Sequence, residues 1–177
     1  MYDAYPMISN SVVSDNVSIS YRVIGAGPRD VFLIHGWLVS GAVYDDLIAA
    51  LDTEGLRLVV IDLRGSGRSG RPNDGYSIAQ YAADVMAVAD ALGSRSFVVV
   101  GHSMGGQIAQ WISATANDRV IGQVLLCPVP ASGIPLPADA RALFRNSAQN
   151  RSMQQTILGL ACKQLGDAER ERLLDDA

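Results

Sequence analysis

Four short runs of apolar residues limit the folds open to this chain more than any other feature of its sequence. None of the four shows the alternation of apolar and polar residues that marks a strand with one face in water. Continuous apolar runs of this length are typical of strands buried on both faces, and parallel strands covered by helices are the usual case. The four runs are Val31–Ile34, Leu58–Ile61, Phe97–Val100 and Val124–Cys127.

The segments between these runs have helical patterns. Apolar residues recur at helical spacing within residues 42–51. Ser77 and the residues after it match a capping box that opens a long helix, which Gly93 is placed to end. A further helix is expected over residues 103–116. Strands and helices thus alternate along the chain, which predicts an α/β fold with a mostly parallel sheet and helices on both faces.

Two flanking segments have a different character. The stretch SVVSDNVSISYRV near the N-terminus alternates on either side of Asp15-Asn16, which predicts a hairpin. The stretch PVPASGIPLP, which begins at Pro128, has four prolines in ten residues and interrupts both sheet and helix. We therefore expect a core over residues 1–130 and the beginning of a helical cap over residues 131–177. Short amphipathic helices are predicted in that cap at 138–148, 153–164 and 167–176.

Composition excludes several classes of protein. A chain of 177 residues suits one domain, and a net charge of −4 gives no basic surface for nucleic acid. No stretch reaches the roughly 20 apolar residues of a membrane span, and no signal peptide is recognisable, so a cytoplasmic protein is expected. Cys127 and Cys162 lack metal-ligand spacing and are expected to be free thiols in the core. The sequence implies neither a metal nor an organic cofactor.

The segment Gly101-His102-Ser103-Met104-Gly105 carries the most specific chemical signal. It follows an apolar run and precedes a predicted helix, which is the context that a G-x-S-x-G nucleophile elbow requires. The strand-to-helix turn is so tight that the flanking positions must be nearly free of side chains. In return, the Ser103 hydroxyl stands clear of the sheet, close to the free N–H groups of the helix N-terminus.

Two further loops are expected beside Ser103. His35-Gly36-Trp37 follows the first apolar run, and the glycine-rich segment Asp62–Ser69 follows the second. The carboxyl ends of parallel strands lie at one edge of a sheet, where open α/β sheets bind ligands. A backbone N–H after the first run, together with the N–H of Met104, would form an oxyanion hole with two donors.

These motifs, in this order, resemble the N-terminal part of an α/β-hydrolase-fold enzyme, from about residue 17 to residue 127. The resemblance implies that Ser103 is the nucleophile and that the amides of Trp37 and Met104 are the oxyanion donors. It implies a structural role for His35 in shaping the oxyanion turn. It also implies a small ester-type substrate, and a cap that begins after Pro128.

Several residues near the motifs have competing interpretations. His102 is adjacent to Ser103, and neighbouring side chains at a strand end point to opposite faces, so it should not reach the serine hydroxyl. Arg64 and Arg68 are either substrate-binding groups or, as we favour, solvated or turn-bracing arginines. Asp62 is expected to brace the glycine-rich loop, and Trp37 either lines the pocket or contributes only its amide.

The sequence does not supply a catalytic base. Both histidines precede Ser103, whereas the triad of this fold runs from serine to acid to histidine along the chain. Pro128, Val129 and Pro130 stand where the acid would be expected. We therefore expect a fragment or one half of something larger. The run Val124–Cys127 is then an apolar edge that aggregates, pairs with another chain or a second copy, or is covered by the C-terminal helices.

Two classes of function follow from these observations. The first is a serine hydrolase that acts on a carboxylic ester or lactone through an acyl-enzyme at Ser103, with the acid and histidine outside this chain. Serine in place of aspartate argues against haloalkane dehalogenase and epoxide hydrolase chemistry, whereas cofactor-free haloperoxidases and carbon–carbon bond hydrolases share the elbow. The second is a non-catalytic binding or assembly module that keeps the fold. The isolated 177 residues are expected to be inactive.

Overall fold

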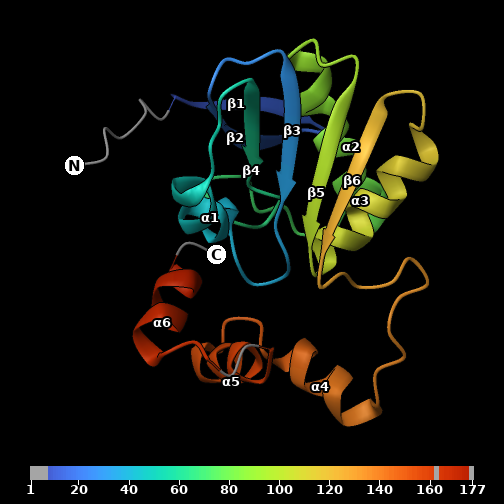
Figure 1. Ribbon diagram of the computed structural model, residues 1–177. Coiled ribbons are helices and arrows are strands. Elements are labelled where there is room, and N and C mark those ends of the chain that lie inside the picture. Colours follow the sequence, from blue (N-terminus) through green and yellow to red (C-terminus); the bar gives the residue numbers. More distant parts are fainter. Residues whose placement is uncertain (1–7, 162–163, 176–177) are drawn as a thin grey trace.

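A computed structural model describes residues 8–161 and 164–175 and contains one six-stranded sheet (Figure 1). The strand order is β1-β2-β4-β3-β5-β6. Strands β3, β4, β5 and β6 are mutually parallel where they pair, and β1 and β2 add an antiparallel hairpin at one side. The strands are β1 (Ile8–Ser14), β2 (Val17–Ile24), β3 (Arg29–Ile34), β4 (Leu56–Ile61), β5 (Phe97–His102) and β6 (Val120–Leu126).

The predicted α/β fold with a mostly parallel sheet is confirmed. The four apolar runs fall on strands β3 to β6, except that Cys127 lies one residue past the end of β6, and the turn of the hairpin lies at Asp15-Asn16. Asp15 and Asn16 both have positive φ, 47° and 60°, as a tight turn between right-handed twisted strands requires. Strand β6 begins four residues before the predicted run. Its first half, which includes Gly122 and Gln123, is not continuously apolar, so the apolar pattern missed it.

Helices cover both faces of the sheet. Helices α2 (Ile78–Ala91) and α3 (Met104–Thr115) pack on one face over the larger apolar core. The short helices η1 (Gly41–Tyr44) and α1 (Asp45–Ala50) lie against the other face, where Tyr44 joins the second core. The Ser77 hydroxyl accepts a hydrogen bond from the Gln80 N–H, so the predicted cap of α2 is confirmed.

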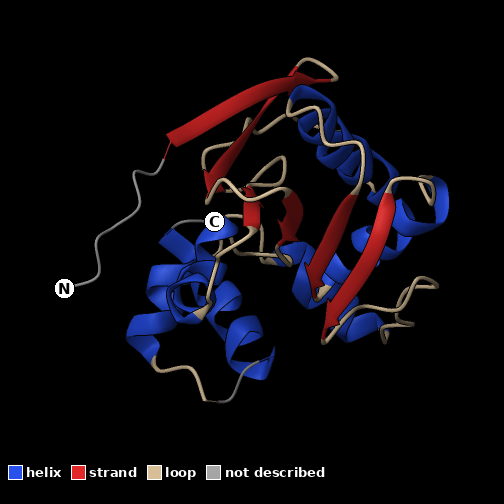
Figure 2. Cartoon of the chain, turned by 45° about the horizontal axis from the view of Figure 1, so that its top comes forward, coloured by secondary structure: helices blue, strands red, loops and turns tan. Residues whose placement is uncertain are grey.

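Three helices follow β6: α4 (Ala138–Asn146), α5 (Arg151–Ala161) and α6 (Asp167–Asp175). Figures 1 and 2 show them as a group below the carboxyl ends of the strands, apart from α2 and α3. Leu158 of α5 and Leu174 of α6 are buried against Val39, in the segment that follows β3. The C-terminal helices therefore rest on the loop after β3.

Strand β6 is an edge strand of the sheet, and its apolar side chains remain partly exposed. Ile121 is 61% exposed and Val124 is 45% exposed. Cys127 is also exposed, so the prediction that it lies in the core is wrong. The residue follows an edge strand and not an interior one. Cys162 lies outside the described residues. Within the described ranges, none of the helices has the length and apolar character needed to cross a membrane.

Candidate active site

Ser103 lies between the end of β5 and the start of α3, in the backbone conformation that a nucleophile elbow demands. Its φ of 54° and ψ of −117° place a non-glycine residue in a strained region. A methyl group at Gly101 would lie 2.3 Å from the Gly105 carbonyl oxygen, and one at Gly105 would lie 2.1 Å from the carbonyl oxygen of Ile34. Only glycine fits at either position, because backbone meets backbone there.

The backbone of Ser103 is anchored to the end of β6. Its N–H donates to the Leu126 carbonyl at 3.0 Å, and its carbonyl accepts from the Val129 N–H at 2.9 Å. The Ser103 side chain forms no capping hydrogen bond with α3, so the hydroxyl is not committed to the helix. These contacts hold the strained turn in place and leave its hydroxyl for other partners.

The turn after β3 lies directly against Ser103. A methyl group on Gly36 would be 3.0 Å from the Ser103 Cβ atom, so the two residues touch. Trp37 follows Gly36, and Leu38 has a positive φ of 60°, which turns the chain sharply at this point. Met104 is the first residue of α3, where backbone N–H groups have no partner within the helix. Both predicted oxyanion donors thus belong to residues next to the Gly36–Ser103 contact.

Both ring nitrogens of His35 are engaged by backbone groups. It is fully buried, and its Nε2 accepts from the Leu63 N–H at 3.0 Å while its Nδ1 donates to the Gly36 carbonyl at 2.7 Å. Both ring nitrogens are therefore occupied by backbone groups of the two loops. Burial lowers the pKa of His35 to about 4, so the ring is neutral at physiological pH.

In the described part of the chain, His102 forms no hydrogen bond with the Ser103 hydroxyl, and neither does His35. The His102 Nδ1 atom is buried without a partner and lies against Gly36, where a methyl group would approach it to 3.3 Å. Burial lowers the pKa of this ring as well.

Asp62 braces the glycine-rich loop, as expected. One carboxylate oxygen accepts from the Gly41 N–H at 2.9 Å and the other from the Arg68 N–H at 3.0 Å. A methyl group on Gly67 would lie 2.4 Å from the Asp62 carboxyl carbon. The carboxylate therefore joins the loop after β4 to η1.

Arg64 is neither solvated nor a simple turn brace, so that expectation is wrong. Its side chain is 1% exposed and donates twice to the fully buried Asp84 of α2, at 2.6 and 2.7 Å. An arginine in this geometry is held by charge-assisted hydrogen bonds and needs its partner to be buried at all. The sequence pattern gave no sign of this pair, because Asp84 looks like one more polar residue of an amphipathic helix.

Two aromatic contacts near the site also had no clear sequence signal. The Trp37 ring lies 4.7 Å from the Phe144 ring of α4, so the C-terminal helices reach the turn after β3. Tyr44 is 3% exposed and donates to the Ile34 carbonyl at the end of β3. Only the three-dimensional arrangement brings the partners of each contact together.

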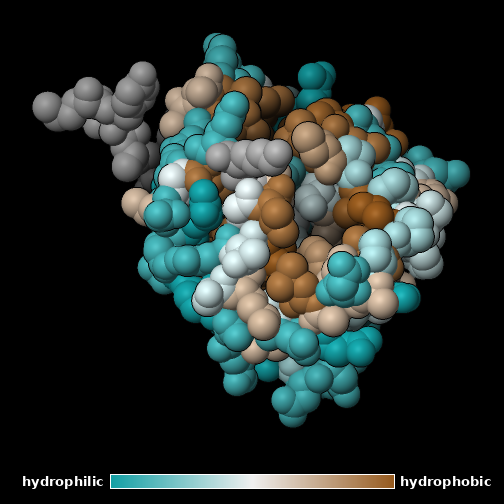
Figure 3. Space-filling view, turned by 90° about the horizontal axis from the view of Figure 1, so that it is seen from below, coloured by the Kyte–Doolittle hydropathy of each residue, from teal (hydrophilic) through white to brown (hydrophobic). Residues whose placement is uncertain are grey.

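The C-terminal helices carry apolar side chains on the face that Figure 3 shows, gathered around a hollow between hydrophilic regions.

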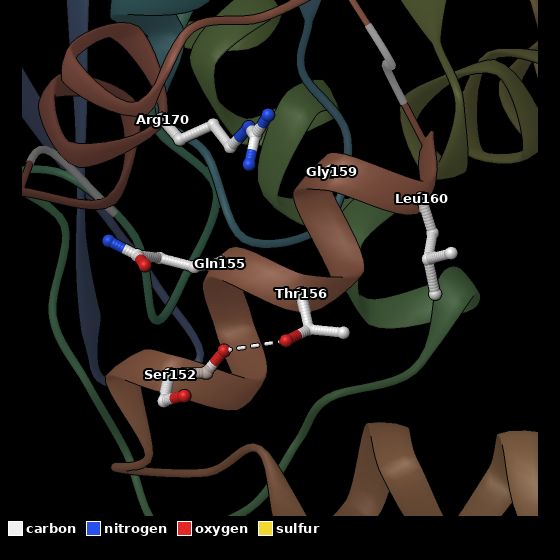
Figure 4. Close-up of a pocket in the computed structure, with 6 residues that line it drawn as sticks. All are labelled: Ser152, Gln155, Thr156, Gly159, Leu160 and Arg170. Carbon is white, nitrogen blue, oxygen red and sulfur yellow. Dashed lines mark hydrogen bonds between the residues drawn. The ribbon is translucent and has the colours of Figure 1, made fainter.

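A separate hollow lies between α5 and α6 and is lined by Gln155, Thr156 and Arg170 among others (Figure 4). The Arg170 guanidinium is already bonded to the Leu165 carbonyl at 2.6 Å and paired with Asp167 at 3.3 Å. In the residues that the structure describes, no group of three or more His, Cys, Asp or Glu side chains could hold a metal ion.

Comparison with known proteins agrees with this geometry. The family model described as alpha/beta hydrolase fold matches residues 31–163, and this chain belongs to that family. The bifunctional esterase/perhydrolase DCH of Acinetobacter calcoaceticus is 41% identical over 120 residues, which cover 66% of this chain and 43% of that protein. A non-heme chloroperoxidase of Streptomyces lividans is 38% identical over 121 residues, with the same two shares covered.

Solved structures give the same result. The structure of Est816, an N-acyl homoserine lactone degrading enzyme, matches with a TM-score of 0.77 and 32% identity, over 94% of this chain and 62% of that one. A bromoperoxidase from Bacillus anthracis matches with a TM-score of 0.77 and 26% identity, over 90% of this chain and 63% of that one. The chain spans less than half the length of the curated relatives it matches.

Proposed function

We propose that this chain carries the nucleophile and the oxyanion donors of a serine hydrolase that acts on carboxylic esters or lactones. The observation that carries the proposal is the strained Ser103, set at the end of β5 with the Gly36 turn in contact with it. A strained, glycine-packed turn costs stability and has little use in a scaffold that does no chemistry.

In the proposed mechanism the Ser103 hydroxyl oxygen attacks the carbonyl carbon of the substrate and gives its proton to a base. The resulting oxyanion accepts hydrogen bonds from the Trp37 and Met104 amides. The tetrahedral intermediate then expels the alcohol, which takes up the proton, and leaves an acyl group on Ser103. Water, activated by the same base, releases the acid and restores the hydroxyl.

The base is proposed to be a histidine outside these 177 residues. His35 is excluded by its two backbone hydrogen bonds and its burial, and His102 by the absence of a hydrogen bond to the Ser103 hydroxyl. Loss of a triad histidine costs on the order of 10⁶ in turnover. We therefore expect the 177 residues alone to be nearly inactive. By the complete protein we mean this chain with whatever sequence or partner accompanies it in the cell.

The test is ester turnover by the complete protein and by its Ser103→Ala variant. The proposal predicts hydrolysis of a p-nitrophenyl acyl ester that falls by about 10⁴-fold or more in the variant. A Ser66→Ala variant is the matched control, since it removes a serine from the neighbouring glycine-rich loop, and it should retain activity. Turnover that survives Ser103→Ala would show that another group is the nucleophile.

A second candidate function within the same site is formation of a peroxy acid. Its support is that one relative is named a bifunctional esterase/perhydrolase and others are named non-heme haloperoxidases. In this reaction hydrogen peroxide would replace water as the acceptor of the acyl group of Ser103. In acetate and peroxide, the peroxy acid would oxidise bromide to hypobromous acid, which brominates monochlorodimedone. Bromination that is lost in Ser103→Ala would support this function.

The alternative from a different class is a binding or assembly module that keeps the fold without catalysis. Its support is that neither histidine of the chain is available as a base. A complete protein that binds an ester analogue but is not acylated at Ser103 would favour this alternative over the hydrolase.

A further inference from the structure

The chain at the end of β6 is bonded to the backbone of Ser103 on both sides. The Ser103 N–H donates to the Leu126 carbonyl at 3.0 Å, and the Ser103 carbonyl accepts from the Val129 N–H at 2.9 Å. Between these two contacts Cys127 has a positive φ of 44°, so the chain turns sharply there. We call residues 126–129 the β6 turn. This turn holds the nucleophile from a neighbouring strand.

The Ser103 carbonyl and the Met104 N–H belong to one peptide group. That group is planar, and in its trans form the C=O and the N–H point in opposite directions. Any contact that fixes the carbonyl therefore also fixes the direction of the Met104 N–H, the proposed oxyanion donor. The carbonyl accepts from the Gly106 N–H at 3.0 Å, within the first turn of α3, and from the Val129 N–H. The Val129 bond thus ties this peptide group to a second element.

The side chain of Gln110, on α3, holds Val129 in place. Its Nε2 donates to the Val129 carbonyl at 2.9 Å and to the Gly106 carbonyl at 3.0 Å, so both of its N–H bonds are used. Pro128 packs against the same part of α3, because a methyl group on Gly106 would lie 2.6 Å from the Pro128 Cβ atom. The missing side chain at Gly106 lets the β6 turn approach α3 closely, within reach of Gln110.

We propose that Gln110 is a positioning residue for the hydrolytic reaction. It holds Val129, the Val129 N–H orients the Ser103–Met104 peptide group, and that group presents its N–H to the oxyanion. A hydrogen bond to the carbonyl also polarises the peptide group and strengthens its N–H as a donor. This inference rests on the proposed function of Ser103, because the direction of the Met104 N–H matters only where an oxyanion is formed.

The test is the Gln110→Met variant of the complete protein, which keeps the length of the side chain and removes both hydrogen bonds. The kcat for a p-nitrophenyl ester, per site titrated with a fluorophosphonate, should fall about 10-fold. This is less than the loss of about 10²- to 10³-fold on removal of an oxyanion donor, because the Met104 N–H is misdirected but still present. The KM should stay within about twofold, since the oxyanion donors act in the transition state. The Ki of a boronic acid, which mimics the tetrahedral intermediate, should rise about 10-fold.

The matched control is Gln107→Met, the same change three residues earlier on α3. The Gln107 Nε2 donates to the Ala131 carbonyl at 3.2 Å, so this variant also removes a bond between α3 and the segment after β6. Ala131 lies beyond the β6 turn, and the variant should leave kcat and Ki unchanged. Titration of active sites separates positioning from loss of folded protein.

Three results would overturn the inference alone. They are unchanged kcat and Ki in Gln110→Met, a loss that appears only as a higher KM, and an equal loss of kcat in Gln107→Met. Turnover that survives Ser103→Ala would overturn the proposed function, and the inference with it.

Discussion

The centre of the sheet is tightly packed, whereas its β6 edge is loosely packed and partly exposed. At the centre, a methyl group on Gly105 would lie 2.1 Å from the Ile34 carbonyl oxygen, and His35 is fully buried with both ring nitrogens bonded. At the margin, a methyl group on Gly122 would meet nothing closer than a Val98 methyl at 3.5 Å, and Ile121 is 61% exposed.

The difference shows which part of the site is held in place entirely by contacts within this chain. The strained Ser103 turn, the His35 hydrogen bonds and the Tyr44–Ile34 hydrogen bond are completed by residues of this chain. Strand β6 holds Ser103 through the Leu126 carbonyl on its inner side, yet presents apolar side chains on its surface. The centre therefore fixes the backbone of Ser103, whereas the edge leaves apolar side chains exposed.

Alanine substitutions at two glycines should give the largest contrast. Gly105→Ala forces a methyl group into a backbone carbonyl and is expected to prevent folding or to lower the free energy of unfolding by more than about 4 kcal/mol. Gly122→Ala has room and should change that free energy by no more than about 1 kcal/mol. Urea denaturation followed by circular dichroism measures both. Equal effects would mean that the centre is not packed as described.

Removal of one charge from each of two ion pairs should give the next largest contrast. Asp84→Asn leaves Arg64 buried without its counter-charge and should cost about 3–5 kcal/mol of stability. Asp90→Asn breaks the pair with Arg119, in which the Asp90 side chain is 67% exposed, and should cost less than about 1 kcal/mol. The same denaturation experiment compares the two. A small effect of Asp84→Asn would contradict the buried pair.

The pH dependence of stability tests the environment of His35. The pKa of His35 falls from 6.5 to about 4 on folding, so below pH 6.5 the unfolded chain binds a proton that the folded chain does not. The stabilisation is present above pH 6.5 and is lost at about 1.4 kcal/mol per pH unit as the pH falls toward 4. His35→Gln should be less stable at pH 7 but should lose less stability over this range. Parallel pH profiles of the two proteins would contradict a buried neutral His35.

The smallest effect on stability is expected at the margin. Ile121→Lys should change the free energy of unfolding by less than about 0.5 kcal/mol, since the side chain is largely exposed. It should nevertheless weaken self-association of the chain, because a charge on an edge strand opposes pairing. Val13→Lys, at a 69% exposed position of β1, is the control. Sedimentation velocity over a range of concentrations measures association, and a chain that is monomeric throughout would contradict an interface between copies at β6.

Much of the fold could be predicted from the sequence because its signals are local. The four apolar runs, the Asp15-Asn16 turn and the Ser77 cap each depend on a few neighbouring residues, and each is confirmed. The glycines around Ser103 also carry a local signal, because the tight turn excludes side chains. Local pattern did not predict the exposure of Cys127, which depends on the position of β6 within the sheet.

The rest of the site depends on contacts between distant segments. Arg64 and Asp84 are 20 residues apart, Trp37 follows β3 whereas Phe144 lies in α4, and Tyr44 donates to the Ile34 carbonyl. Nothing in the spacing of these residues indicates that they meet, because each also suits an ordinary helix face or turn. Such contacts follow only from the way the elements pack.

The central claim, that Ser103 is a nucleophile whose base lies outside these residues, is tested most directly by covalent labelling. The complete protein and the isolated 177-residue chain are each treated with a fluorophosphonate, digested and analysed by mass spectrometry. We expect the complete protein to be labelled on Ser103 and the isolated chain to react about 10³-fold more slowly or not at all. Rapid labelling of the isolated chain at Ser103, or labelling of the complete protein at another residue, would contradict it.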